Sequence, residues 1–229
     1  MTQHKSKVCD FYSVFKDKHK GKPVLVLGNG WSINSYPKSV YEKFYTISVN
    51  MIFGYHGFQP DIYLCSDTWL WIAFRDKLKS LKSIKISNTC LQAQDINDYA
   101  IAFSQDILEE LKPIDHGHLW SIGSSVHFCI HLAAIMGASE ILLHGCDGMP
   151  EHYPLHFYEE YLWDEYFNKL IQAFEFVNEP KWKSNQHNMH TDLFKKVSVT
   201  TKALGLNILN VSPISTYDCF PKANLLDFI

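Results

Sequence analysis

Glycines and polar residues follow the clearest predicted strand of the chain. The run Pro23–Leu27 is short and continuously apolar, which is typical of a parallel strand buried on both faces. Four candidate binding residues come directly after it: Gly28, Asn29, Gly30 and Ser32. Glycines let a phosphate approach the backbone, and N–H groups at a helix start attract an anion. We expect these residues to bind the phosphates of a nucleotide; a plain strand-to-helix turn is the alternative.

Two common nucleotide motifs are absent from this turn. Ile33 stands where a dinucleotide fingerprint would have its third glycine, so a standard NAD site is disfavoured. No Lys-Ser or Lys-Thr pair follows at the distance that a Walker motif requires.

Polar residues also follow the next two predicted strands, Tyr45–Val49 and Asp61–Cys65. Asn50 comes after the first of these, and Ser66 and Asp67 come after the second. Ligands of open α/β sheets bind beyond the carboxyl ends of the strands, so these side chains are placed to bind a base, a ribose or a sugar hydroxyl. Helix capping is the alternative role for each.

Two further turns complete the candidate binding site. Ser124 and Ser125 open a helix predicted over 124–136, where hydroxyl and N–H groups form a second anion site, or simply cap the helix. Asp147 follows the predicted strand Glu140–His144 at a glycine-rich turn, a place where an aspartate often has a functional role.

Histidines supply the candidate general base. His187 and His190 precede a helix predicted over Asp192–Leu204, and imidazole titrates near neutral pH. His127 and His131 share one helix face, but no Glu follows His127 as a zinc-protease motif requires, and no Asp-x-Asp triplet occurs. We therefore expect no cofactor, and either no metal or a metal held by separated residues.

Strand and helix signals alternate along the chain. Further strands are predicted at Ser83–Ser87 and Asn207–Val211, and a further helix at about Phe157–Phe176. The alternation predicts an α/β fold: a modified Rossmann-like, mostly parallel, doubly wound sheet in one domain over 1–229. A lid is expected at about 146–190, within which Cys146–Phe157 and Asn178–Asn188 are the mobile candidates.

Composition excludes several classes of protein. A formal charge of -3 without long runs of one sign disfavours nucleic-acid binding. No signal peptide and no apolar run of membrane-spanning length is visible, and the six cysteines are scattered, so we expect a cytoplasmic protein. A short basic stretch at 16–22 is interpreted as solvated, with peripheral membrane contact as the alternative. A homo-oligomer is also left open.

Five motifs together resemble two related families. They are Val-Leu-Gly-Asn-Gly-x-Ser-Ile, Asn50, Gly-Ser-Ser-Val, Leu-His-Gly-Cys-Asp and His-x-x-x-Thr-Asp, in order over about residues 23–192. The set resembles bacterial CMP-sialic-acid-dependent sialyltransferases that act on lipooligosaccharide. It also resembles the MptE-like, 6-hydroxymethylpterin diphosphokinase-like domain.

The sialyltransferase resemblance implies a function in lipopolysaccharide biosynthesis: inverting transfer of a sugar acid from a CMP-activated donor to a glycan acceptor. By motif position it implies that Asn29 and Asn50 contact CMP and that His187 is the base, with His190 in reserve. Tyr153 and Tyr158 fall where that family has lid tyrosines that support the departing phosphate. The chain has Gly148 where the family carries an aromatic residue after the aspartate, and its lid spacing differs.

The second resemblance implies a different reaction. An MptE-like enzyme would transfer diphosphate from ATP with Mg²⁺, and Asp67 and Asp147 would then be metal-ligand candidates. A nucleotide-sugar-binding module without catalysis is the third hypothesis.

Overall fold

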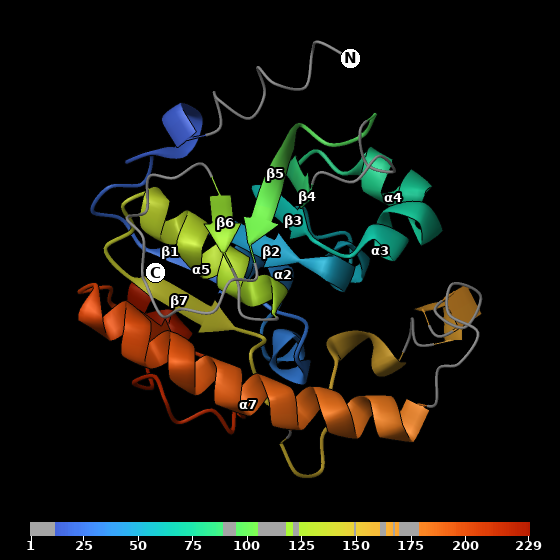
Figure 1. Ribbon diagram of the computed structural model, residues 1–229. Coiled ribbons are helices and arrows are strands. Elements are labelled where there is room, and N and C mark those ends of the chain that lie inside the picture. Colours follow the sequence, from blue (N-terminus) through green and yellow to red (C-terminus); the bar gives the residue numbers. More distant parts are fainter. Residues whose placement is uncertain are drawn as a thin grey trace.

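The computed structural model describes residues 12–88, 95–104, 118–120, 124–148, 150–160, 164–166, 168–169 and 179–229. Within them, eight strands form one sheet in the order β6-β5-β4-β3-β2-β1-β7-β8, and every pairing is parallel (Figure 1). The strands are β1 (Val24–Leu27), β2 (Tyr45–Val49), β3 (Ile62–Cys65), β4 (Ile84–Asn88), β5 (Tyr99–Ser104), β6 (His118–Trp120), β7 (Ile141–His144) and β8 (Ile208–Asn210).

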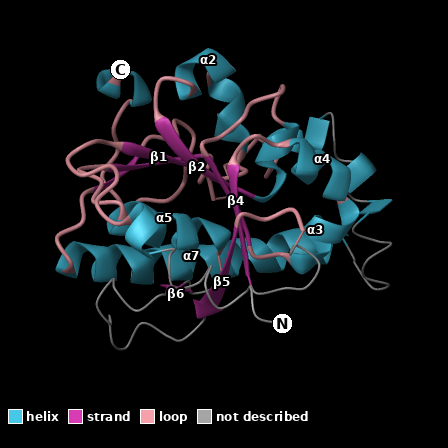
Figure 2. Cartoon of the chain, turned by 90° about the horizontal axis from the view of Figure 1, so that it is seen from above, coloured by secondary structure: helices cyan, strands magenta, loops and turns pink. Residues whose placement is uncertain are grey.

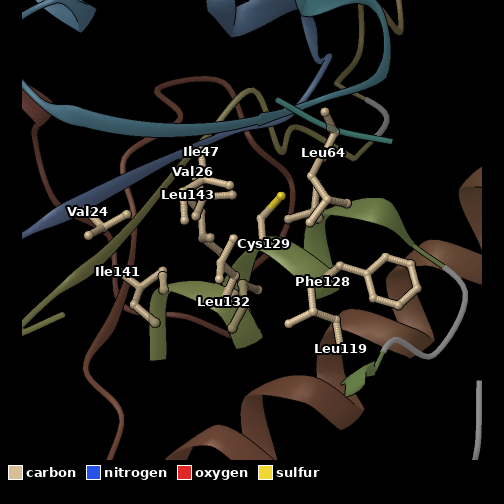
Figure 3. Packing of buried hydrophobic residues seen from close by; sticks show 14 of the residues in the cluster. Val24, Val26, Ile47, Leu64, Leu119, Phe128, Cys129, Leu132, Ile141 and Leu143 are labelled. Carbon is tan, nitrogen blue, oxygen red and sulfur yellow. The ribbon is translucent and has the colours of Figure 1, made fainter. Parts of the chain in front are cut away.

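Central strands are apolar throughout because both of their faces are buried. Side chains alternate across a strand, so Val24 and Val26 enter one core cluster while Leu25 and Leu27 enter the other. All four are fully buried. Figure 3 shows the first cluster, in which Leu132 and other side chains of α5 pack on the sheet.

Helices cover both faces of the sheet (Figure 2). One cluster is completed by α5 (Ser125–Ile135) and α7 (Glu179–Ala203), and the other by α2 (Lys38–Tyr41), α3 (Thr68–Ala73) and α4 (Arg75–Ser80). Short 3-10 helices lie at η1 (Trp31–Ser35), η2 (Asn50–Gly54), η4 (Phe157–Glu160) and η5 (Leu225–Phe228). The predicted doubly wound, Rossmann-like α/β fold is confirmed.

The order of the strands reverses between β1 and β7. Strands β1 to β6 extend the sheet in one direction, and the chain then returns through α5 to place β7 on the other side of β1. In open α/β sheets the ligand binds outside the carboxyl ends of the strands at such a switch point. A ligand-binding site is therefore expected at the turns after β1 and β7.

Most of the predicted elements agree with the structure to within a residue or two, and two strands were missed. The observed β2 has the predicted bounds, and the predicted helix over 124–136 is α5. Strands β5 and β6 were not predicted; β6 has only three residues, too few for a visible pattern.

The predicted start of the last long helix was wrong. We expected it at Asp192 and placed a mobile loop at Asn178–Asn188, but α7 begins at Glu179 and contains both histidine candidates. The polar sequence there hid the helix, although Pro180 in the first turn is a typical start signal, since the N–H that proline lacks has no partner there.

The helix predicted over Phe157–Phe176 is only partly described. It starts as the short 3-10 helix η4, and 164–166 and 168–169 are helical, while the rest lies outside the described residues. Among the helices that the structure describes, none is both long and apolar enough to cross a membrane.

Candidate functional site at the switch point

The turns after β1 and β7 pack directly against each other. Gly28 N–H donates to the His144 carbonyl at 2.8 Å, and Gly30 N–H donates to the Gly145 carbonyl at 2.7 Å. A Cβ on Gly28 would lie 2.3 Å from the Gly145 oxygen, and one on Gly30 would lie 2.5 Å from Asp147 Oδ2. Both glycines are therefore required by the close contact of the two turns.

Asp147 holds the turn after β1 in place. Its side chain is buried, with the residue 2% exposed, and its two oxygens accept from Ser32: the backbone N–H at 2.6 Å and the hydroxyl at 2.5 Å. Burial raises the pKa of this carboxyl, and the hydrogen bonds from Ser32 oppose that rise. Thr216 N–H donates to the Asp147 carbonyl at 2.8 Å, which ties the turn to the segment after β8.

We expected Gly28, Asn29, Gly30 and Ser32 to bind the phosphates of a nucleotide, and this role stays a prediction. In the structure the N–H groups of Gly28, Gly30 and Ser32 donate to the His144 carbonyl, the Gly145 carbonyl and Asp147 Oδ2, so they hold the two turns together. Asp147 can be identified in the sequence as an aspartate after β7. Its hydrogen bonds with Ser32, 115 positions earlier, cannot be predicted from the sequence.

Asn29 and Asn50 carry amide oxygens that are buried without a hydrogen-bond partner among the described residues. Strands β1 and β2 are neighbours whose register ends at Leu27 and Ser48, so Asn29 and Asn50 both follow the carboxyl ends of adjacent strands. Asn50 has a φ of 49°, in the left-handed region that asparagine tolerates better than most residues. A buried acceptor without a donor costs free energy, which a ligand donor would recover.

Another polar group lies across β3, β4 and the start of α5. Ser66 Oγ and Ser125 Oγ are 3.1 Å apart, and Asn88 Nδ2 donates to the Ser66 carbonyl at 2.9 Å. The Asn88 amide oxygen is buried and accepts no hydrogen bond from the part of the chain that the structure describes. The sequence analysis did not select Asn88 as a candidate. Its position at the end of β4, like that of Asn50 directly after β2, is the signal that could have identified it.

Capping does not account for the polar residues at the helix starts. Asp67 is the N-cap of α3 and Ser124 is the N-cap of α5, but neither side chain makes a capping hydrogen bond. Gly123, the glycine of the Gly-Ser-Ser-Val motif, lies outside the described residues. Asp67 instead has the Ser66 hydroxyl as its hydrogen-bond partner, and burial raises the pKa of its carboxyl.

The segment 150–160 is attached to the turn after β1. Phe157 N–H donates to the Asn29 carbonyl at 3.0 Å, and Gly30 forms an isolated bridge with His156. The two lid tyrosines differ: Tyr153 is 47% exposed, whereas Tyr158 is 3% exposed. The Tyr158 hydroxyl donates to Tyr166, and burial raises the Tyr158 pKa far above its usual range.

The side chains of the two candidate bases are not described by the structure. His187 and His190 lie in α7, but their side chains are outside the described part of the structure. Their pairing with the acceptor therefore stays a prediction. Among the described residues, no group of three or more His, Cys, Asp or Glu side chains is placed to hold a metal ion.

An all-parallel sheet with its polar site at the β1–β7 switch point defines a Rossmann-like α/β protein. Its fold is similar to that of the sialyltransferase CstII from Campylobacter jejuni solved with cytidine-5'-monophosphate: 15% identity, TM-score 0.56, covering 90% of this chain and 87% of that one. A CstII structure with CMP-3FNeuAc gives 17% identity, TM-score 0.52 and coverage of 89% and 87%. No protein-family model and no curated protein matches the sequence.

Proposed function

We propose that this protein is a glycosyltransferase that transfers a sugar from a CMP-activated donor to a glycan acceptor. The observation that carries the proposal is the pair of buried amide oxygens of Asn29 and Asn50 at the ends of neighbouring strands. Solved structures with this fold were determined with CMP or a CMP-sugar analogue.

The chemistry of these asparagines suits a nucleoside. An amide oxygen accepts hydrogen bonds, and the hydroxyls of ribose and the exocyclic amino group of cytosine are donors. Because the oxygens are closed off in the structure, a nucleoside reaches them only if a covering segment moves. The first part of the segment 150–160 is suited to this movement, since Tyr153 there is 47% exposed, whereas Phe157 and Tyr158 at its end are buried in the core.

In the proposed reaction a base deprotonates the acceptor hydroxyl as CMP leaves the anomeric carbon, with inversion. We assign the base to His187, with His190 as the second candidate. A positioned base of this kind contributes about 10²–10⁴-fold to rate. Tyr153, which is exposed, is the lid tyrosine available to a departing phosphate, whereas the Tyr158 hydroxyl is used by Tyr166.

The experiment is to follow CMP release from CMP-sialic acid in the presence of an oligosaccharide acceptor, for the wild type and the His187→Ala and His190→Ala variants. We expect His187→Ala to lower kcat at least about 100-fold while donor affinity changes little. Loss of turnover only in His190→Ala would move the base to His190, and normal turnover in both variants would contradict a histidine base in α7.

The diphosphokinase alternative has less support. It needs Asp67 and Asp147 as ligands of Mg²⁺, but both oxygens of Asp147 already accept hydrogen bonds from Ser32. Sensitivity of turnover to EDTA with ATP as substrate would favour it.

A further inference from the structure

The carboxylate of Asp67 has no positive partner in the described part of the chain. Its neighbours are neutral: the Ser66 hydroxyl, and the phenols of Tyr63, Tyr158 and Tyr166, whose pKa values burial raises. The residue Asp67 is half-buried, and no cation of the described residues pairs with its carboxylate. A half-buried carboxylate with one hydroxyl partner retains capacity for further donors.

The groups beside Asp67 are also acceptors. The Ser66 hydroxyl, which favours the charged form of Asp67, also lies 3.1 Å from the Ser125 hydroxyl. Asn88 is fixed in orientation because its Nδ2 donates to the Ser66 carbonyl, and this leaves its buried Oδ1 without a donor. Together Asp67, Ser66 and Asn88 form an acceptor-rich cluster at the carboxyl ends of β3 and β4.

The cations of the neighbourhood are engaged elsewhere. Arg75 is the only arginine of the sequence, and it pairs with Asp95 at the surface. Lys77 pairs with Glu165, and Lys169 donates to the Ala73 carbonyl. No ion pair to Asp67 occurs within the described residues, so the cluster has a negative charge that nothing there compensates.

We propose that Asp67, Ser66 and Asn88 form the subsite for the transferred sugar, which accepts hydrogen bonds from its hydroxyl or ammonium groups and disfavours a carboxylate there. The inference rests on the proposed function, which places the nucleoside over β1 and β2. In the sheet order, β3 and β4 come next after β2, so this cluster is adjacent to the proposed nucleoside site, and the inference places the transferred sugar over it. Asp67 is then a specificity-determining residue, since like charges in a partly buried site repel strongly.

The test compares two ligands, CMP and the non-transferable analogue CMP-3FNeuAc, whose sugar carries a carboxylate, by calorimetry at pH 7.5. In Asp67→Asn we expect the Kd of the analogue to fall about tenfold, because the repelling charge is removed and an acceptor oxygen remains. The Kd of CMP should change less than about twofold. In Asn88→Ala we expect the Kd of the analogue to rise about fivefold, with CMP unchanged.

The control is Asp76→Asn, which makes the same chemical change at an exposed position of α4 and should leave both Kd values unchanged. Melting temperatures of all variants check folding. An analogue affinity that does not improve in Asp67→Asn, or a CMP affinity that improves equally, overturns the sugar subsite. If the wild type binds neither ligand, the proposed function itself fails, and that result is distinct because it appears before any variant is compared.

Discussion

At the scale of single residues, one carboxylate determines the geometry of the candidate site. Both carboxylate oxygens of Asp147 accept hydrogen bonds from Ser32. The Ser32 hydroxyl also accepts a hydrogen bond from Gly145 N–H at 3.1 Å. These contacts give Asp147 a positioning role, and the expected contact with the substrate stays a prediction. Asn29 is fixed in position because Gly28 before it and Gly30 after it are both hydrogen-bonded to the end of β7 and the turn that follows.

Replacing Asp147 by Asn should lower the free energy of unfolding by about 2 kcal/mol, because an amide offers one acceptor oxygen where the carboxylate offers two, so one Ser32 donor is left without its partner. Urea unfolding would show a lower midpoint with an unchanged m-value. Asp227→Asn, at an exposed position of η5, is the matched control and should be neutral. Equal midpoints for the two variants would show that the contact contributes nothing.

Asp67 should have the opposite effect on stability. Burial raises its pKa in the folded protein, so folding favours the protonated form. Its contribution is most favourable below roughly pH 4, the usual pKa in unfolded chains, and is lost as pH rises through the folded pKa. Asp67→Asn should therefore raise the melting temperature at pH 7 but not at pH 3.5. A lower melting temperature at pH 7 would contradict this account.

At the scale of elements, the strands that surround the switch point could be predicted from the sequence and their pairing could not. Strands β1 and β7 are visible as apolar runs such as Val24–Leu27, because a strand buried on both faces needs no polar residue. The contacts between the turns are long-range and leave no local pattern. Gly30 looks like part of a phosphate-binding turn, and only the structure shows that Asp147 occupies the space where its Cβ would be.

The early start of α7 is testable with a proline. Asn188→Pro, in the interior of the helix, should cost about 3 kcal/mol locally and abolish turnover, because it removes a backbone hydrogen bond beside His187. Asn188→Ala keeps the helix and should retain activity. Amide hydrogen exchange over 179–203 is the direct measurement: protection that begins only near residue 192 would restore the loop that we first expected.

At the scale of the whole molecule, buried histidines make the fold sensitive to acid. Burial lowers the pKa of His131 to about 3 and that of His144 to about 4. Below pH 6.5 the unfolded chain binds protons that these folded residues do not bind, so the free energy of unfolding falls as pH falls towards 4, by up to about 1.4 kcal/mol per pH unit for each.

Replacing His131 by Leu should remove the contribution of His131 to the pH dependence of the free energy of unfolding. The prediction is a smaller loss of stability between pH 6.5 and 4.5 for His131→Leu than for the wild type, measured by chemical denaturation at each pH. Parallel curves for the two proteins would mean that His131 does not stay neutral in the folded protein.

We propose that CMP binds at Asn29 and Asn50, after the carboxyl ends of β1 and β2, and a thermal-shift titration with CMP, UMP, AMP and GMP tests this directly. A ligand that binds only the folded state raises the melting temperature. We expect CMP to raise the melting temperature more than the other nucleotides do, and we expect this rise to be lost in Asn29→Ala and in Asn50→Ala. No shift with CMP, or equal shifts with all four nucleotides that survive both substitutions, would contradict it.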